Sequence, residues 1–130
     1  MLKTELSSDP RSVAEVEKLV EDISSQYSLD QETQANLLIS LTEAVNNAII
    51  HGNGSEPSKK VSIMLSRCRG GFAVKVQDQG TGFNFRELPD PTKPENLCKC
   101  GGRGVFLMNQ LCDEMKYTNG GSTVEMQFRI

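Results

Sequence analysis

Residues 36–53 constrain the fold most, because their hydrophobic periodicity is that of one long helix with two opposed faces. They read NLLISLTEAVNNAIIHGN. At 100° per residue its main apolar positions fall on one side of a helix, as a core-facing stripe should. These positions are Leu37, Leu41, Val45, Ala48 and Ile49. The pattern predicts a long amphipathic helix that runs to His51 and stops at Gly52, where a left-handed residue is expected.

Glu43 lies opposite the apolar stripe, and Asn47 shares its face because it follows one turn later, at i+4. Ile39 and Ile50 flank Glu43 and are poor choices for a surface open to water, so this face is expected to be covered. A covered acid and amide suit a site in which Asn47 offers an oxygen to a hard cation and Glu43 accepts a proton. The alternative is an ordinary solvated helix face with two polar residues. The sequence of this helix, taken by itself, favours that alternative.

The composition fits one domain and limits the partners. With 130 residues and 37% hydrophobic content, the chain can form a single domain over residues 1–130 with a substantial core. The net charge of −3 and the pI near 5.2 argue against a nucleic-acid or anionic-membrane partner, because such partners reward clustered Lys and Arg. A protein or a small molecule is the expected partner.

The chain carries no recognisable membrane or export signal, so a cytoplasmic protein is expected. Its cysteines are then expected as thiols. They are Cys68, Cys98, Cys100 and Cys112. The spacing of Cys98 and Cys100 suggests zinc, but a closed zinc site needs four ligands and the only histidine, His51, belongs to the long helix. Two incidental thiols are the preferred interpretation.

Hydrophobic periodicity and turn residues assign the remaining elements. In chain order these are strand 2–6, a helix to Tyr27, the long helix capped by Asp30, strands 61–66 and 72–77, a lid, a helix from 101–104, and strands 115–118 and 122–130. The first helix begins either at Asp9, with Pro10 in its first turn, or at a capping box of Ser12 and Glu15. This order predicts an α+β fold, in which a mixed sheet packs helices on one face.

The stretch of about 83–100 has neither a helical nor a strand period, and Pro89, Pro91 and Pro94 oppose a regular element through most of it. It exceeds the roughly 12–15 residues beyond which structureless loops are uncommon unless functional or disordered. It is predicted to be a lid.

Two glycine-rich segments lie at junctions where glycine has a mechanical use. In the first, Gly80 and Gly82 let the backbone approach a flat ligand, while Asp78 at the strand end can accept a hydrogen bond from an exocyclic amine. In the second, Gly101–Gly104 bares amide N–H groups at a helix start, where the dipole favours phosphate and Arg103 adds charge. Each segment, taken singly, could be an ordinary turn.

Together and in this order, the three segments resemble the N box and the two glycine boxes of the GHKL ATPases. The stretches EAVNNAIIHGN, VQDQGTGF, GGRGVFLMNQLCDEM and GSTVEMQFRI look most like the bacterial anti-sigma factor serine/threonine kinases of the partner-switching type. The resemblance spans nearly the whole chain. It implies the Bergerat fold, a two-layer α/β sandwich whose mixed, mostly antiparallel sheet is covered on one face by three helices.

The resemblance assigns the base and metal side of a pocket for ATP or ADP with Mg²⁺. It makes Asn47 the Mg²⁺ ligand and Asp78 the acceptor of the adenine amino group. Gly80 and Gly82 would shape the adenine side. Ser122 matches a hydroxyl residue that helps to hold adenine through water in related ATPases.

The resemblance also assigns the phosphate side and the catalytic group. Gly102, Arg103 and Gly104 would bind phosphate, and Glu43 would be the general base. The lid is short beside those of the chaperones and topoisomerases of the superfamily. Contacts to the γ-phosphate are therefore expected to be few and turnover slow.

The function implied is that of a serine protein kinase and anti-sigma factor. It would bind a sigma factor and phosphorylate a serine on a small antagonist protein, and a homodimer is expected by resemblance. One alternative is a nucleotide-binding regulatory module without kinase activity. Another is the ATP-binding subunit of a histidine kinase, which ranks last because the chain lacks a helical phosphoacceptor domain. No direct contact with nucleic acid or membrane is expected.

Overall fold

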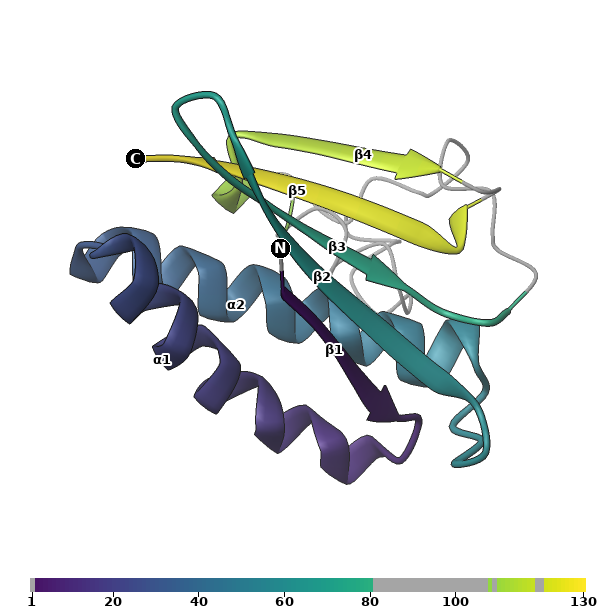
Figure 1. Cartoon of the computed structure of the whole chain (residues 1–130). Coiled ribbons are helices and arrows are strands. Elements are labelled where there is room, and N and C mark those ends of the chain that lie inside the picture. The colour runs from purple at the N-terminus through teal and green to yellow at the C-terminus, as the bar shows by residue number, and fades with distance from the viewer. Residues whose placement is uncertain (1, 81–107, 109, 119–120) are drawn as a thin grey trace, which may run out of the picture.

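In the part of the chain that the structure describes, two α-helices pack against one face of a five-stranded sheet (Figure 1). The computed structural model describes residues 2–80, 108, 110–118 and 121–130. The strands are β1 (Leu2–Ser7), β2 (Lys60–Cys68), β3 (Gly71–Gln77), β4 (Glu114–Thr118) and β5 (Thr123–Arg129). The helices are α1 (Glu15–Tyr27) and α2 (Gln31–Asn47), with a 3₁₀ turn η1 (Pro10–Ala14) before α1 and a π-helical turn η2 (Ala48–Gly52) after α2.

The strand order is β1-β2-β3-β5-β4, and every pairing of described strands is antiparallel. The predicted mixed sheet is therefore wrong for the described strands. The reason lies in the last hairpin, because β4 runs parallel to β3 but is not its neighbour. The chain folds back from β4 so that β5 lies between the two, which leaves only antiparallel pairs.

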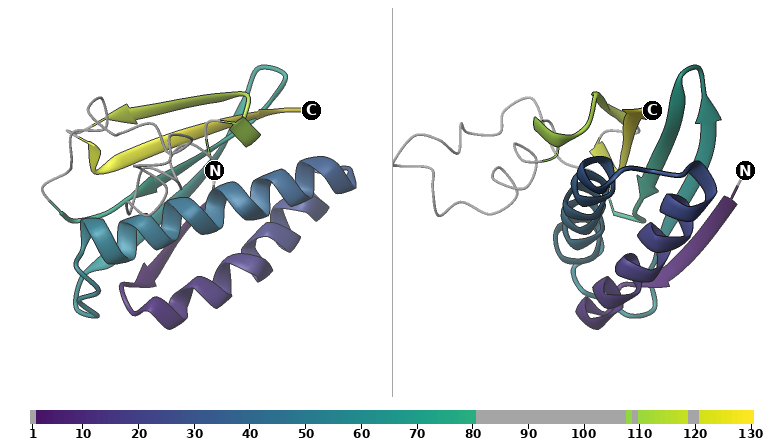
Figure 2. Two further views of the ribbon diagram at one scale, coloured as in Figure 1. Left: turned by 180° about the vertical axis from the view of Figure 1, so that it is seen from behind. Right: turned by 90° about the vertical axis from the view of Figure 1, so that its left-hand side faces the viewer.

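The two-residue period of the strands places one face of the sheet under the helices (Figure 2). In β2, Val61, Ile63 and Leu65 are buried, whereas the alternating Ser62 and Met64 are only partly covered. A period of two with one buried face is typical of an antiparallel sheet that packs helices on one side. The predicted alternation is confirmed.

A stack of aromatic rings joins the end of α1 to the sheet. The ring of Phe72 lies 4.9 Å from that of Tyr27 and 5.3 Å from that of Phe128, measured between centroids. Phe72 is fully buried at the far end of β3 from Asp78. The guanidinium of Arg67 lies over the outer Tyr27 ring, 5.8 Å from its centroid.

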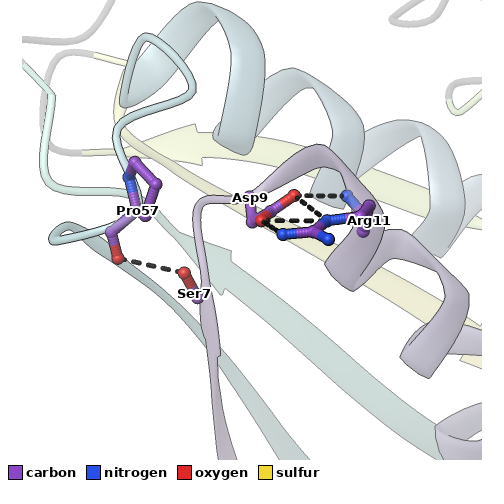
Figure 3. Close-up of polar contacts among 4 residues, drawn as sticks. All are labelled: Ser7, Asp9, Arg11 and Pro57. Atoms are coloured by element: carbon purple, nitrogen blue, oxygen red, sulfur yellow. Dashed lines mark hydrogen bonds and ion pairs between the residues drawn. The ribbon is translucent and has the colours of Figure 1, made fainter.

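The first helical segment begins at Asp9, one of the two predicted starts. The carboxylate of Asp9 accepts a hydrogen bond of 2.9 Å from the backbone N–H of Arg11 and is held by the Arg11 guanidinium (Figure 3). Beside it, the Ser7 hydroxyl donates to the Pro57 carbonyl, which ties β1 to the loop before β2. The first segment is 3₁₀ rather than α, and the α-helix proper starts at Glu15.

The long helix differs from its prediction at its end. Asp30 caps it as predicted, accepting from the Thr33 N–H at 2.8 Å. However, α2 stops at Asn47 and continues as η2, and the left-handed residue expected at Gly52 is found at Gly54, with φ 62°. A π-turn closes on the carbonyl five residues back, so the chain leaves the helix on a wider turn than the periodicity indicates.

The predicted third helix lies largely outside the described residues, in which two α-helices are found. Met108, Gln110 and Leu111 are helical, and Met108 is buried in the core. Cys112 is also buried, donates from Sγ to the Met108 carbonyl, and has its thiol pKa raised to about 11 by burial. The described helices are not of the length and apolar character that a membrane crossing requires.

Candidate functional site

The outer face of α2 carries the first group of predicted site residues. Glu43 and Asn47 are both partly buried. The side-chain nitrogen of Asn47 is buried and has no hydrogen-bond partner among the described residues. Because an unpaired buried polar group costs about 1–3 kcal/mol, this amide is placed for a partner that the described residues do not supply.

The predicted cover over this face is only partial. Ile39 is 43% exposed and Ile50 is 40% exposed, which makes them, with Ile130, the large apolar side chains left most open in the described part. The sequence does not say which segment would cover them, and the predicted lid of about 83–100 falls outside the described residues. The face therefore combines half-buried polar groups with apolar side chains that remain accessible.

The end of β3 carries the second group. The backbone N–H of Asp78 donates to the Ser122 carbonyl at 2.9 Å, so the start of β5 lies beside Asp78. One oxygen of the Asp78 carboxylate accepts the Gly80 N–H at 2.8 Å. Burial raises the pKa of this carboxyl, although the Gly80 hydrogen bond and nearby Lys59 act in the opposite direction. Asp78 is thus a half-buried acceptor with lone pairs to spare.

The turn η2, which follows α2, lies against the turn at the end of β3. A Cβ added at Gly52 would overlap the Asp78 carboxylate, and one added at Gly80 would overlap the Gly52 carbonyl oxygen. The two segments therefore approach too closely for a side chain at either glycine.

Asn53 holds the same junction through its side chain. Its amide nitrogen donates to the Ser8 hydroxyl at 2.7 Å and to the Lys60 carbonyl at 3.1 Å. Its amide oxygen accepts the backbone N–H of Gln79 at 2.7 Å. The Gln79 side chain in turn accepts the Lys60 N–H at 2.6 Å. One buried amide thus connects the end of β1, the exit of η2, the start of β2 and the turn after β3.

The contributions of Gly52 and Asn53 are absent from the sequence-based prediction. Gly52 is predicted only as a helix stop, and its actual constraint is the close approach of Asp78. Asn53 lies between two glycines and is predicted only as part of the same helix-stop signal. Its almost complete burial, at 2% exposure, is what distinguishes it from an ordinary loop asparagine.

The remaining predicted site residues lie outside the described part of the chain. They are Gly82, Gly102, Arg103 and Gly104. Cys98 and Cys100 also lie there. The described residues contribute no group of three His, Cys, Asp or Glu side chains that could hold a metal ion.

The described residues fit a purine nucleotide with a divalent cation. Asp78 is a half-buried acceptor, and Gly80 leaves the backbone bare beside it. Asn47 has a buried amide nitrogen without a described partner, and its amide oxygen is the kind of group that ligates Mg²⁺. A single protein ligand is ordinary for Mg²⁺ in nucleotide sites, since phosphates and waters complete its octahedron.

Relatives of known name share both the sequence pattern and the fold. The family model described as the histidine kinase-like ATPase domain matches residues 6–128. Serine-protein kinase RsbW of Bacillus velezensis is 27% identical over 132 residues, which cover 96% of this chain and 82% of that protein. Anti-sigma F factor of Halalkalibacterium halodurans is 36% identical over 92 residues, or 68% of this chain and 60% of that protein.

A solved structure of the RsbU and RsbW domains of a Mycobacterium tuberculosis protein matches with a TM-score of 0.65 at 17% identity. It covers 98% of this chain, which in turn spans 31% of that longer protein. At this identity the match supports the fold alone. The family match, by contrast, extends over the described helices and strands except residues 2–5 of β1 and Arg129 at the end of β5. The chain therefore belongs to the histidine kinase-like ATPase family, in its branch of anti-sigma factor serine kinases.

Proposed function

We propose that this protein is an ATP-dependent serine kinase that phosphorylates an anti-sigma factor antagonist and sequesters a sigma factor. Its family and the names of its relatives support the activity. The observation that carries the proposal is the junction at Gly52, which seats the Asp78 carboxylate against the end of the helix that bears Glu43 and Asn47.

Each site residue has a role that suits its surroundings. Asp78 accepts the adenine amino group, and Gly80 and Gly82 leave room for the flat base. Asn47 gives its amide oxygen to Mg²⁺, while its buried amide nitrogen, which has no partner among the described residues, is left to donate to a ligand oxygen. Ser122, whose carbonyl already holds Asp78, contributes to the adenine side.

On the phosphate side, Gly102, Arg103 and Gly104 bind the nucleotide phosphates through backbone N–H groups and a guanidinium. Bound ATP with Mg²⁺ supplies the γ-phosphoryl group. Glu43 accepts the proton of the attacking serine hydroxyl, which is a poor nucleophile without a base. Its partial burial on α2 is compatible with this role, because part of the side chain stays exposed.

Replacing Glu43 with Gln tests the role of the base. The variant keeps the shape of the side chain but cannot accept a proton, so phosphate transfer to an antagonist should fall by about 10²- to 10⁴-fold while ATP affinity stays nearly unchanged. The rate is measured with labelled ATP, Mg²⁺ and purified candidate antagonists. Glu17→Gln, an exposed glutamate of α1, is the matched control.

Equal transfer by wild type and Glu43→Gln would refute the assignment of the base. If the wild type binds ATP tightly but never yields phosphoserine, the protein is instead a regulatory module that uses the nucleotide to set its shape. Acid-labile phosphohistidine on a partner would indicate the histidine kinase type.

The finer features of the family belong to the same proposal. We expect one domain over residues 1–130 in the cytoplasm, with a lid over about 83–100 and a third helix from Gly101 completing the Bergerat fold. The partners are a sigma factor, its antagonist and a second copy of the chain. Affinity capture from the native cell extract with ADP and with ATP, followed by phosphosite mapping, should recover both regulators. Recovery of neither would contradict the partner assignment.

A further inference from the structure

At the contact between η2 and the turn after β3, glycine is required by the close approach of other atoms and not by backbone conformation. Neither Gly52 nor Gly80 has a positive φ angle, so neither is glycine because of its backbone conformation. Each is restricted by what a side chain would meet. A Cβ on Gly52 would overlap both Cγ and Oδ2 of Asp78, so the carboxylate occupies the space that any larger residue at position 52 would need.

The side chain of Asn53 also holds the turn after β3 in place. Its amide makes three hydrogen bonds, to Ser8, Lys60 and Gln79, and it is almost fully buried. The N–H whose hydrogen bond Asn53 accepts belongs to Gln79, the residue between Asp78 and Gly80. Asn53 therefore fixes the peptide that carries Asp78, while Gly52 leaves the space for its carboxylate.

We propose that Gly52 and Asn53 are positioning residues that set the preference of the nucleotide site for a base with an exocyclic amine. The inference rests on the proposed function, in which Asp78 accepts that amine. Neither residue contacts the base in this account. Gly52 acts by leaving the Asp78 carboxylate in place, and Asn53 acts by fixing the turn from which it projects.

The test compares two ligands that differ only at the recognised group. They are ATP and the triphosphate of purine riboside, which has hydrogen in place of the 6-amino group. A hydrogen bond to a charged group is worth at least about a tenfold difference in affinity, so the wild type should prefer ATP by that factor or more. Gly52→Ala and Asn53→Ala should each remove most of this preference.

The ratio of the two dissociation constants isolates positioning from stability. A partly unfolded variant binds both ligands more weakly by the same factor, so its ratio is unchanged. Gly54→Ala is the matched control, because Gly54 has φ 62° and a Cβ there meets nothing within 4 Å. It should lower stability and keep the ATP preference. In an Asp78→Asn background, Gly52→Ala should have no further effect on the ratio.

The outcomes separate the two claims. If the wild type prefers ATP and both Gly52→Ala and Asn53→Ala keep that preference, the positioning inference is wrong and the proposed function stands. If Gly52→Ala does not fold, Asn53→Ala decides alone. If the wild type binds neither ligand, or both equally, the adenine role of Asp78 fails and the positioning inference fails with it.

Discussion

At the scale of single residues, Asp78 combines a proposed binding role with a cost in stability. Its carboxylate is half-buried beside Gly52, and burial raises its pKa above the ordinary value of 3.8. At neutral pH the group is nevertheless needed as a charged acceptor in the proposed site. A half-buried carboxylate that costs stability is expected where ligand binding, rather than folding, determines which residue stands at the position.

Asp78→Asn should therefore stabilise the free protein at neutral pH. A raised folded-state pKa means that the stability contributed by Asp78 is present below the unfolded pKa and is lost as the pH rises through the folded value. The variant should exceed the wild type in urea midpoint at pH 7, and this gap should narrow as the pH falls towards 4. Asp22→Asn, on the exposed face of α1, is the surface control. A wild type more stable than Asp78→Asn at pH 7 would contradict this account.

Single-residue roles were predictable from the sequence where chemistry is local. The acid and amide on one helix face follow from the i+4 spacing of Glu43 and Asn47. The constraint on Gly52 does not follow in this way, because it comes from Asp78, which is distant in sequence. Periodicity reports which face of an element is buried, not which residue it meets.

At the scale of elements, the ends of the helices were less predictable than their existence. The starts at Asp9 and Asp30 were readable because capping depends on neighbouring residues. The π-turn after Asn47 was not, since residues 48–52 continue the helical pattern and the wider turn leads into the buried contacts of Asn53.

The end of α1 offers a prediction on stability at this scale. Ser28 closes the helix with φ 53°, a left-handed conformation that costs a non-glycine residue. Ser28→Gly should raise the free energy of unfolding by about 0.5–1 kcal/mol. The same change at exposed Ser25, inside the helix, should lower it by about 0.5 kcal/mol. Urea denaturation measures both, and equal effects of the two substitutions would refute the helix-end argument.

At the scale of the whole molecule, the sheet order decides where the site lies. The hairpins β2–β3 and β4–β5 were predictable from their turn residues. The pairing of β3 with β5 was not, because it joins strands that are far apart in the sequence. This pairing places the Ser122 carbonyl on the Asp78 N–H and so completes one side of the site.

The nucleotide itself was implied by family resemblance, since the residues alone left ordinary turns open as an alternative. Two packing contacts join the helices to the sheet. The aromatic stack of Tyr27, Phe72 and Phe128 packs α1 on the sheet, and the junction at Gly52 joins α2 to the end of β3. The two contacts lie at opposite ends of β3, so they hold the helices against the sheet at both ends.

The central claim is that the α2 face and the end of β3 form a single nucleotide site, and calorimetric titration with ATP tests it most directly. With Mg²⁺, the wild type should bind one ATP per chain. Asp78→Asn should weaken binding with and without Mg²⁺, whereas Asn47→Ala should weaken only the Mg²⁺-dependent part. Absence of ATP binding by the wild type, or wild-type affinity in both variants, would contradict the claim.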